Sequence, residues 1–250
     1  MTKLDLFGAV HDLCPVARPD VAESETRCEA CGSRMQGICS ALELTELSEI
    51  EHLSKPLCLP ARAALLREGQ DRDVVYTITV GMVRLSRTLP EGQRQIVGFA
   101  IPGDFLGLDL SREIAFSAEA INQVNVCRFQ RREFTEFLAR KPHLMARLHE
   151  LTAHELHHAQ DHMVVLGVKN ADGKVAAFLI NLRDRLAKLD RVVVNVPLAM
   201  TRQDIGDYLG LTVETVSRTM TKFARQKLLV VTPDGVRLLD PDKLRLMAEL

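Results

Sequence analysis

The chain has 250 residues, of which 46% are hydrophobic and 26% are charged, and its formal net charge is −1 at pH 7. These values are ordinary for a soluble globular protein, and they exclude a protein that binds nucleic acid through a uniformly basic surface. The N-terminus lacks the basic flank and continuous apolar stretch of a secretion signal, and no apolar run reaches the about 18 residues of a membrane span. We therefore expect a cytoplasmic protein without a membrane partner, in which any affinity for nucleic acid must come from a local patch.

Residues 1–45 form an arm that is rich in cysteine and in turn residues. Four of the six cysteines lie here, at Cys14, Cys28, Cys31 and Cys39, while Cys58 and Cys127 stand alone. Because a reducing cytosol keeps thiols free, metal binding or redox chemistry is the leading interpretation of cysteines that cluster. Cys58 is interpreted as an ordinary small buried apolar residue.

Residues 46–140 are predicted to form a β domain. Short runs of β-forming residues cover 74–81, 82–88, 94–100 and 124–129, and turn signals at 90–92 and 102–104 separate them. Many short strands at this spacing predict a compact barrel or jelly roll.

A helical stretch is predicted from residue 131 to residue 166. Apolar and small residues recur along it three or four positions apart, at Leu144, Leu148, Thr152, Leu156, Ala159, Met163 and Leu166. Such a stripe must be covered, and a second copy of the chain is its simplest partner. We therefore predict a dimerisation helix over residues 141–168, with Leu148, Leu156, Ala159 and Met163 at the interface of a homodimer. Packing of the stripe against the chain's own β domain is the alternative.

Residues 169–250 have the pattern of a winged helix-turn-helix domain. A helix that begins near Asn170 carries apolar residues on one face, at Val175, Phe178, Leu179 and Leu182. Further along, Thr201 can cap a short helix, Gly210 can end it, and Thr212 can cap the next helix. Residues 229–232 and 236–239 flank a turn and predict a hairpin wing.

The helix that follows Thr212 has two faces. Its apolar residues Val213, Val216, Met220 and Phe223 are spaced to pack inward. Glu214, Ser217 and Arg218 lie on another face near the helix N-terminus, where a recognition helix presents side chains to base edges. The DNA contacts that we expect are Glu214, Ser217, Arg218, Thr212, Thr215 and Lys222. The alternative is an amphipathic helix whose polar residues are incidental.

The segment from Thr201 to Arg218, TRQDIGDYLGLTVETVSR, closely resembles the helix-turn-helix of the cyclic-AMP receptor protein/FNR superfamily, and FNR-type anaerobic regulators in particular. The similarity extends to the β domain at 98–99 and 103–107 and to residues 169–178. The resemblance implies an α+β fold: an N-terminal arm, an antiparallel β-roll like that of cyclic-nucleotide-binding domains, a long dimerisation helix and a winged helix-turn-helix. It also implies double-stranded DNA with a palindrome of the TTGAT-N4-ATCAA kind as the partner.

Two ligand classes are known for this β-roll. Members that bind cyclic nucleotides use a glutamate, an arginine and a serine; the corresponding positions here are Leu108, Phe116 and Ser117. An aromatic ring cannot replace a guanidinium that pairs with a phosphate, so we expect no cyclic nucleotide.

The cysteines predict the other ligand. Cys28, Cys31, Cys39 and Cys127 supply four thiolates, the usual ligand set of a 4Fe-4S cluster, although zinc also accepts four thiolates. The resemblance to FNR-type oxygen sensors, and to their α-proteobacterial members in the spacing between Cys31 and Cys39, favours the cluster, with one per subunit. Absence of any metal is the remaining alternative.

The string His154-Glu155-Leu156-His157-His158 matches the motif of zinc proteases but lies on the predicted dimerisation helix without an evident third ligand. We interpret it as a solvated polar face, and we expect no enzyme. The resemblance instead implies an oxygen-responsive activator of genes for anaerobic or microaerobic metabolism.

The resemblance also bears on the partners of the regulator. RNA polymerase would contact the loop at Glu91 and Gly92, which can equally be read as an exposed turn. Some relatives carry an acidic residue at the position of Ala159, where like charges across the interface weaken the dimer. With Ala159 this repulsion is absent here. The alternative function is a cluster-free regulator of the same superfamily, controlled by abundance or by thiol oxidation.

Overall fold

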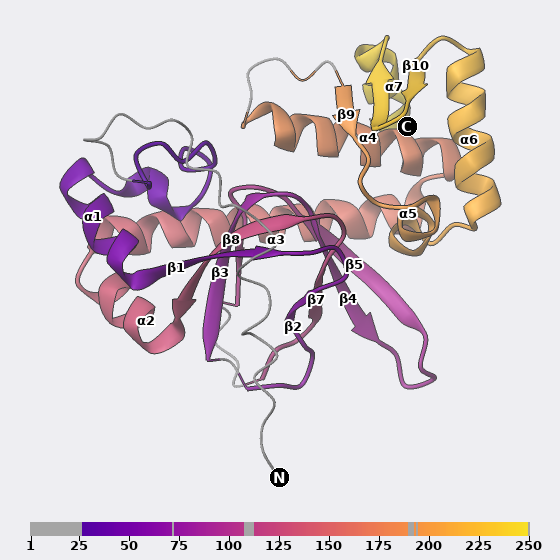
Figure 1. Ribbon diagram of the computed structural model, residues 1–250. Coiled ribbons are helices and arrows are strands. Elements are labelled where there is room, and N and C mark those ends of the chain that lie inside the picture. The colour runs from indigo at the N-terminus through magenta and orange to yellow at the C-terminus, as the bar shows by residue number, and fades with distance from the viewer. Residues whose placement is uncertain (1–26, 72, 108–112, 190–192, 194, 250) are drawn as a thin grey trace. The chain divides into compact units, whose positions relative to one another are not determined.

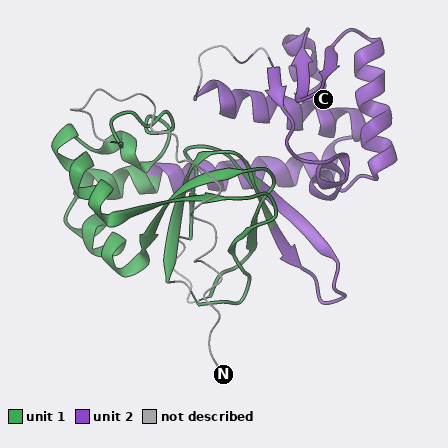
Figure 2. Cartoon of the chain, viewed as in Figure 1, with its two compact units in different colours: residues 1–85, 99–149 green, residues 86–98, 150–250 purple. Residues whose placement is uncertain are grey.

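The structure, a computed structural model, describes residues 27–71, 73–107, 113–189, 193 and 195–249 (Figure 1). The chain divides into two compact units, one made of Met1–Leu85 and Phe99–His149 and the other of Ser86–Gly98 and Glu150–Leu250 (Figure 2). Each unit contains its own set of buried hydrophobic side chains.

The first unit begins, among the described residues, with a turn-rich segment that leads into the 3-10 helix η1 (Ile38–Ala41) and helix α1 (Leu44–Leu53). Helix α1 starts with a capping box, in which Glu43 and Glu46 each accept the other's backbone N–H. Its Leu47 and Ile50 are buried, while Thr45, Ser48 and Glu49 are exposed. This helix connects the cysteine-containing segment to the β domain that follows it along the chain.

The β domain contains two four-stranded sheets, ordered β1-β8-β3-β6 and β2-β7-β4-β5. The strands are β1 (Ser54–Leu59), β2 (Ala64–Leu66), β3 (Val74–Val80), β4 (Val83–Thr88), β5 (Arg94–Ala100), β6 (Phe105–Leu106), β7 (Ser117–Ala120) and β8 (Val124–Gln130). Strand β8 pairs antiparallel with both β1 and β3. The predicted runs at 74–81, 82–88, 94–100 and 124–129 are confirmed as β3, β4, β5 and β8.

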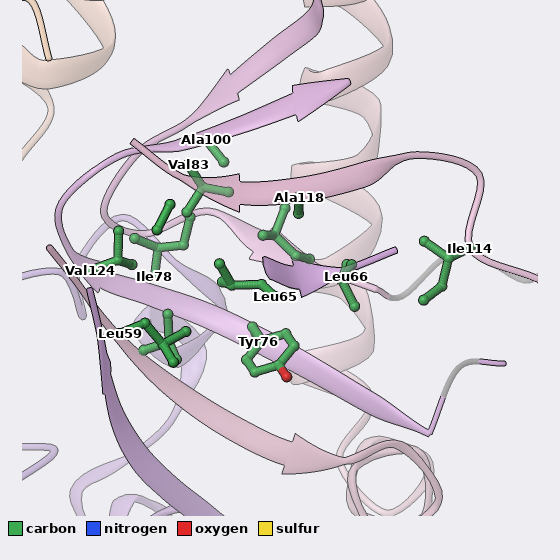
Figure 3. Packing of buried hydrophobic residues seen from close by; sticks show 13 residues of the cluster. Leu59, Leu65, Leu66, Tyr76, Ile78, Val83, Ala100, Ile114, Ala118 and Val124 are labelled. Atoms are coloured by element: carbon green, nitrogen blue, oxygen red, sulfur yellow. The ribbon is translucent and has the colours of Figure 1, made fainter. Parts of the chain in front are cut away.

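Apolar side chains from both sheets fill the interior of the β domain (Figure 3). Ile78 and Val124 come from the first sheet, and Leu66, Val83 and Ala118 come from the second. Alternate residues of a strand point to opposite faces, so one face of each sheet can be apolar while the other carries polar groups.

Helices α2 (Arg131–Ala139) and α3 (Pro142–Val168) follow β8. The prediction of one continuous helical stretch is wrong at Arg140 and Lys141, where the helix is interrupted. Pro142 explains the interruption, because proline lacks an N–H group and disfavours helical conformation in the residue before it. Helix α3 has 27 residues, all within the described part of the chain, and Leu144 is the one among them that is buried.

The second unit contains α4 (Ala171–Ala187), β9 (Asn195–Pro197), α5 (Arg202–Leu209), α6 (Val213–Arg225), β10 (Leu229–Thr232), β11 (Gly235–Leu238) and α7 (Pro241–Glu249). The predicted wing is confirmed as the antiparallel pair β10 and β11, and the short β9 adds a third strand beside β11. Within the described residues, no helix combines the length and the apolar character that crossing a bilayer requires.

Candidate metal centre and nucleic-acid interface

The four cysteines predicted as metal ligands line one pocket of the first unit. Cys28 and Cys31 lie in a turn, Cys39 lies in η1, and Cys127 lies in the middle of β8. All four thiols are free and half-buried. The other lining residues of the pocket are Ser33, Arg34, Gly37, Ile50, Ser54, Thr77, Thr79 and Phe129. The structure therefore brings together residues that the sequence separates widely.

The turn that carries Cys28 is attached to the end of α1 through Glu51. The backbone N–H of Cys28 donates to Glu51 Oε2 at 3.2 Å. Arg27 lies 3.8 Å from the same carboxylate and donates to Ser54 Oγ at 3.3 Å. These contacts hold Cys28 near the pocket through residues of the chain itself.

The segment between Cys31 and Cys39 packs closely against the turn after β5. A Cβ atom added at Gly37 would lie 2.8 Å from the carbonyl oxygen of Gly103, and one added at Gly103 would lie 2.9 Å from Cβ of Gln36. Gly103 also has a φ of +96°, a conformation that side chains rarely adopt. Arg147 of α3 donates to the carbonyl oxygen of Gln36 at 3.0 Å. The cysteine segment thus contacts both the β domain and the first turns of α3.

Burial dominates the electrostatics of the pocket. Burial, followed by the charge of neighbouring cysteines, raises the pKa of Cys28 to about 12 and also raises the pKa of Cys39. Burial and the charge of Cys31 raise the pKa of Cys127 to about 11. Arg27 and Arg34 act in the opposite direction on these pKa values but are outweighed. The thiols of Cys28, Cys39 and Cys127 are therefore protonated at neutral pH unless a cationic centre stabilises the thiolates.

Among the described residues, no group of three or more histidine, cysteine or acidic side chains is arranged to hold a metal ion. The metal assignment of Cys28, Cys31, Cys39 and Cys127 thus stays a prediction at this stage.

The two remaining cysteines differ from the four in the pocket. Cys58 is half-buried on β1, and its sulfur accepts a hydrogen bond from Nε2 of Gln123 at 3.5 Å. Cys14 lies outside the described residues.

The positions that correspond to a cyclic-nucleotide site carry other contacts. Phe116 packs against the apolar cluster of the β domain. The hydroxyl of Ser117 accepts the backbone N–H of Glu68 at 3.1 Å. Leu108 lies outside the described residues.

The histidine string on α3 is mostly exposed, as predicted: His154 and His157 are exposed and His158 is half-buried. Nε2 of His154 lies 3.2 Å from the ammonium of Lys188, and Nδ1 of His158 lies 3.2 Å from Nδ2 of Asn181. Burial, and then the nearby cations Arg185, His154 and Lys188, lower the pKa of His158. A cation next to both rings opposes the binding of a further cation such as zinc.

The helix-turn-helix of the second unit is built by local capping. The hydroxyl of Thr201 accepts the N–H of Asp204 at 3.0 Å, and Thr212 accepts the N–H of Thr215 at 3.2 Å. Gly210, between the two helices, has a φ of +63°, the left-handed conformation that ends α5. These contacts confirm the predicted caps.

Helix α6 buries its apolar face and exposes its predicted reading face. Val216, Met220 and Phe223 are at most 3% exposed, while Val213 is half-buried. The residues predicted to contact DNA are otherwise at the surface: Glu214, Ser217, Arg218, Thr212 and Lys222 are exposed, and Thr215 is half-buried. Arg218 donates to Thr215 Oγ1 at 3.3 Å, and the ammonium of Lys222 pairs with the Asp172 carboxylate of α4. Arg218 is thus held along the exposed face of the helix.

The predicted dimerisation residues lie along the exposed side of α3. Leu156 is 58% exposed and Met163 is 63% exposed, Ala159 is exposed, and Leu148 is half-buried. A stripe of exposed apolar side chains on one helix is typical of an interaction surface.

Known proteins match both parts of the chain. Residues 56–141 match the cyclic nucleotide-binding domain, and residues 173–247 match the Crp-like helix-turn-helix domain. The transcriptional activatory protein AadR of Rhodopseudomonas palustris is 45% identical over 93% of this chain and 98% of its own length. The nitrogen fixation regulation protein FixK of Bradyrhizobium diazoefficiens is 46% identical over 88% of this chain and 93% of its own. The chain belongs to the CRP/FNR family of transcription regulators.

A solved structure agrees with this assignment. FixK2 from Bradyrhizobium japonicum superposes with a TM-score of 0.72 at 34% identity, over 78% of this chain and 96% of that one. The predicted α+β fold and α-proteobacterial type are thereby confirmed, and this CRP/FNR protein is a transcription regulator and not an enzyme. Its Crp-like helix-turn-helix indicates that it binds DNA.

Sequence reasoning about this CRP/FNR protein missed several residues that the structure places near the predicted sites. Glu51, Arg147 and Thr77 contact or line the cysteine pocket region. Arg94, next to the loop that contains Glu91 and Gly92, donates to Asp204 Oδ1 of α5 at 3.2 Å. The one available signal was Thr77, a polar residue inside an apolar strand.

Proposed function

We propose that this protein is an oxygen-responsive transcription regulator in which Cys28, Cys31, Cys39 and Cys127 hold one 4Fe-4S cluster per subunit. The observation that carries the proposal is the pocket that all four cysteines share, three from the segment before α1 and one from the central strand β8. When bound, the cluster supplies an oxygen-labile link between that segment and the β domain.

The charges around the pocket support this ligand. Burial and the neighbouring cysteines raise the pKa values of these thiols. They lose their protons readily only when a cationic metal centre stabilises the thiolates. The guanidinium groups of Arg27 and Arg34 favour the thiolate form and would offset part of the negative charge that four thiolates bring.

The resemblance to FNR-type oxygen sensors in the spacing of the cysteines favours a cluster over zinc. Both ligands accept four thiolates, so the shared cavity by itself suits either of them. The iron content of protein isolated without oxygen distinguishes the two.

The contacts of the cysteine segment supply a path to the rest of the molecule. Arg147, on the first turns of α3, donates to Gln36 between Cys31 and Cys39. A change in the position of this segment therefore acts on the helix that carries the exposed stripe at Leu156 and Met163. This supports a switch in which the occupied pocket favours the homodimer and the empty pocket favours the monomer.

The dimer would present two copies of α6 to a two-fold DNA site of the TTGAT-N4-ATCAA kind. Glu214, Ser217 and Arg218 are exposed on one face and have the hydrogen-bonding groups that read base edges. RNA polymerase is the proposed further partner, at the loop with the exposed Glu91 and Gly92. Phe116 and the occupied hydroxyl of Ser117 argue against a cyclic nucleotide.

The test uses full-length protein isolated without oxygen. We expect a broad absorbance band near about 400 nm and close to four irons per subunit, the composition of the proposed cluster. A gel shift on a TTGAT-N4-ATCAA duplex should show tight binding before exposure to air and weak binding after it. The same duplex with scrambled half-sites is the control.

Two outcomes would contradict the proposal in different ways. A colourless, iron-free protein that binds the palindrome equally well in both conditions would favour the alternative, a cluster-free regulator controlled by abundance or thiol oxidation. A protein with four irons that binds DNA equally before and after air exposure would remove the sensing role and leave a DNA-binding metalloprotein.

A further inference from the structure

Thr77 of strand β3 places a hydroxyl group in the cysteine pocket. The residue is 5% exposed, and it lines the cavity together with the four cysteines. Its Oγ1 atom is fully buried and has no hydrogen-bond partner among the described residues. A buried hydroxyl without a partner is destabilising, so its presence here needs a physical reason.

The strand register places this hydroxyl next to a predicted ligand. Thr77 is paired directly with Cys127 across the antiparallel strands β3 and β8. Directly paired residues carry their side chains on the same face of a sheet, close enough to contact each other. The hydroxyl of Thr77 is therefore on the side of the sheet from which the Cys127 sulfur enters the pocket.

Two other hydroxyl-bearing side chains in the pocket lining, Thr79 and Ser33, already have hydrogen-bond partners. Thr79, two residues later on β3 and also in the pocket lining, donates its hydroxyl to the carbonyl oxygen of Asn125 at 3.0 Å. Ser33 Oγ lies 3.3 Å from Cys31 Sγ. Thr77 lies between the buried residues Tyr76 and Ile78 of β3. A valine in place of Thr77 would fill the same volume without a hydroxyl.

We propose that Thr77 is a positioning residue of the metal centre, whose hydroxyl donates a hydrogen bond to a sulfur atom there, either the Cys127 thiolate or a cluster sulfide. The inference rests on the proposed cluster. A sulfur atom that carries negative charge is the acceptor that this buried donor lacks. Hydrogen bonds to the sulfur atoms stabilise the cluster and raise its reduction potential.

The test compares three variants of the full chain, each reconstituted without oxygen. Thr77→Val removes the hydroxyl at nearly constant volume, Thr77→Ser keeps the hydroxyl, and Thr79→Val removes a pocket hydroxyl that already has a protein partner. We measure iron per subunit, the reduction potential, and the half-life in air of the absorbance band at about 400 nm, and we compare each value with that of the unmodified protein. The unfolding temperature of the metal-free variants is measured in parallel.

For Thr77→Val we expect a half-life that is shorter by on the order of tenfold and a lower reduction potential, as for the loss of other outer contacts of metal ligands. Thr77→Ser and Thr79→Val should stay within about twofold of the unmodified protein. In the metal-free state Thr77→Val should unfold at the same or a higher temperature, because it removes a buried hydroxyl that has no partner. A purely structural role predicts loss of stability in both states.

Each other outcome overturns the inference. An unchanged half-life and potential for Thr77→Val in a protein that binds four irons would reject the role of Thr77 and leave the proposed function standing. Equal effects of Thr77→Val and Thr79→Val would show a general response to pocket substitutions. An unmodified protein that binds no iron would overturn this inference and the proposed function together.

Discussion

Helix α6 and the cysteine pocket draw on different ranges of the chain. The caps, the buried face and the exposed face of α6 come from the short stretch between Thr201 and Arg225, and each depends on contacts within one or two helical turns. The pocket joins a turn before α1 to the central strand β8, and its side chains are buried and mutually unfavourable when charged. A locally built site works wherever its helix folds, whereas the pocket exists only once the first unit is complete.

The largest effect is expected from Cys127→Ser. The serine hydroxyl is a poor ligand for iron, so this variant should lose the cluster's absorbance band at about 400 nm. It should also fail to bind the palindrome when it is prepared without oxygen. Iron analysis and a gel shift measure both effects. If the variant keeps its iron and binds DNA normally, the pocket does not control the helix-turn-helix.

The next largest effect concerns the helix through which the pocket would act on α6. Leu156→Glu places a carboxylate in the exposed apolar stripe of α3, twice in a two-fold dimer, and loses about 1.5–3 kcal/mol of burial per subunit. Sedimentation velocity of the iron-loaded protein should show a monomer. His157→Glu, at the neighbouring exposed position off the stripe, is the control and should leave the dimer intact. A dimer that tolerates Leu156→Glu would place the interface elsewhere.

The reading face of α6 provides a smaller and purely local effect. Arg218→Ala should weaken binding to the palindrome by about 1–3 kcal/mol, relax specificity at one base pair, and leave the iron content unchanged. Fluorescence anisotropy with matched and substituted duplexes measures this. Arg225→Ala, exposed near the helix C-terminus, should weaken binding to all sequences alike. Equal losses on both kinds of duplex for Arg218→Ala would assign Arg218 to the phosphate backbone.

The smallest effect concerns the ion pair between Glu46 of α1 and Lys141 at low pH. The hydrogen bond from Lys141 first, then the backbone N–H of Glu43 and the ring of His143, lower the pKa of Glu46 to about 2 from its ordinary value of 4.5. A carboxylate whose pKa falls on folding stabilises the protein above its unfolded pKa, and this contribution disappears as the pH falls from 4.5 towards 2.

Glu46→Gln should therefore flatten the pH dependence of unfolding in that window. Urea unfolding of metal-free protein at several pH values measures this, with Glu133→Gln, exposed on α2, as the control. If Glu46→Gln retains the full pH dependence, other carboxylates account for the acid sensitivity of the first unit.

Features that depend on residues close together in the sequence could be predicted without the structure, whereas features that depend on distant residues could not. The caps at Thr201 and Thr212, the buried Val216, Met220 and Phe223, and the strands β3 and β8 depend on spacing and on residue type, which the sequence displays directly. Pro142 also encodes the break between α2 and α3, although the apolar stripe by itself predicts one continuous helix.

The amino-acid sequence alone therefore determined the CRP/FNR type of the chain, the position of its reading helix and the identity of four candidate ligands. Only the tertiary structure decided that these cysteines share one cavity and that Arg147 reaches the segment between them. It also decided that Thr77 is paired with Cys127 and that its hydroxyl has no hydrogen-bond partner within the described part of the chain. Strand register and side-chain burial arise from pairing between distant segments, and no local pattern of residues reports them.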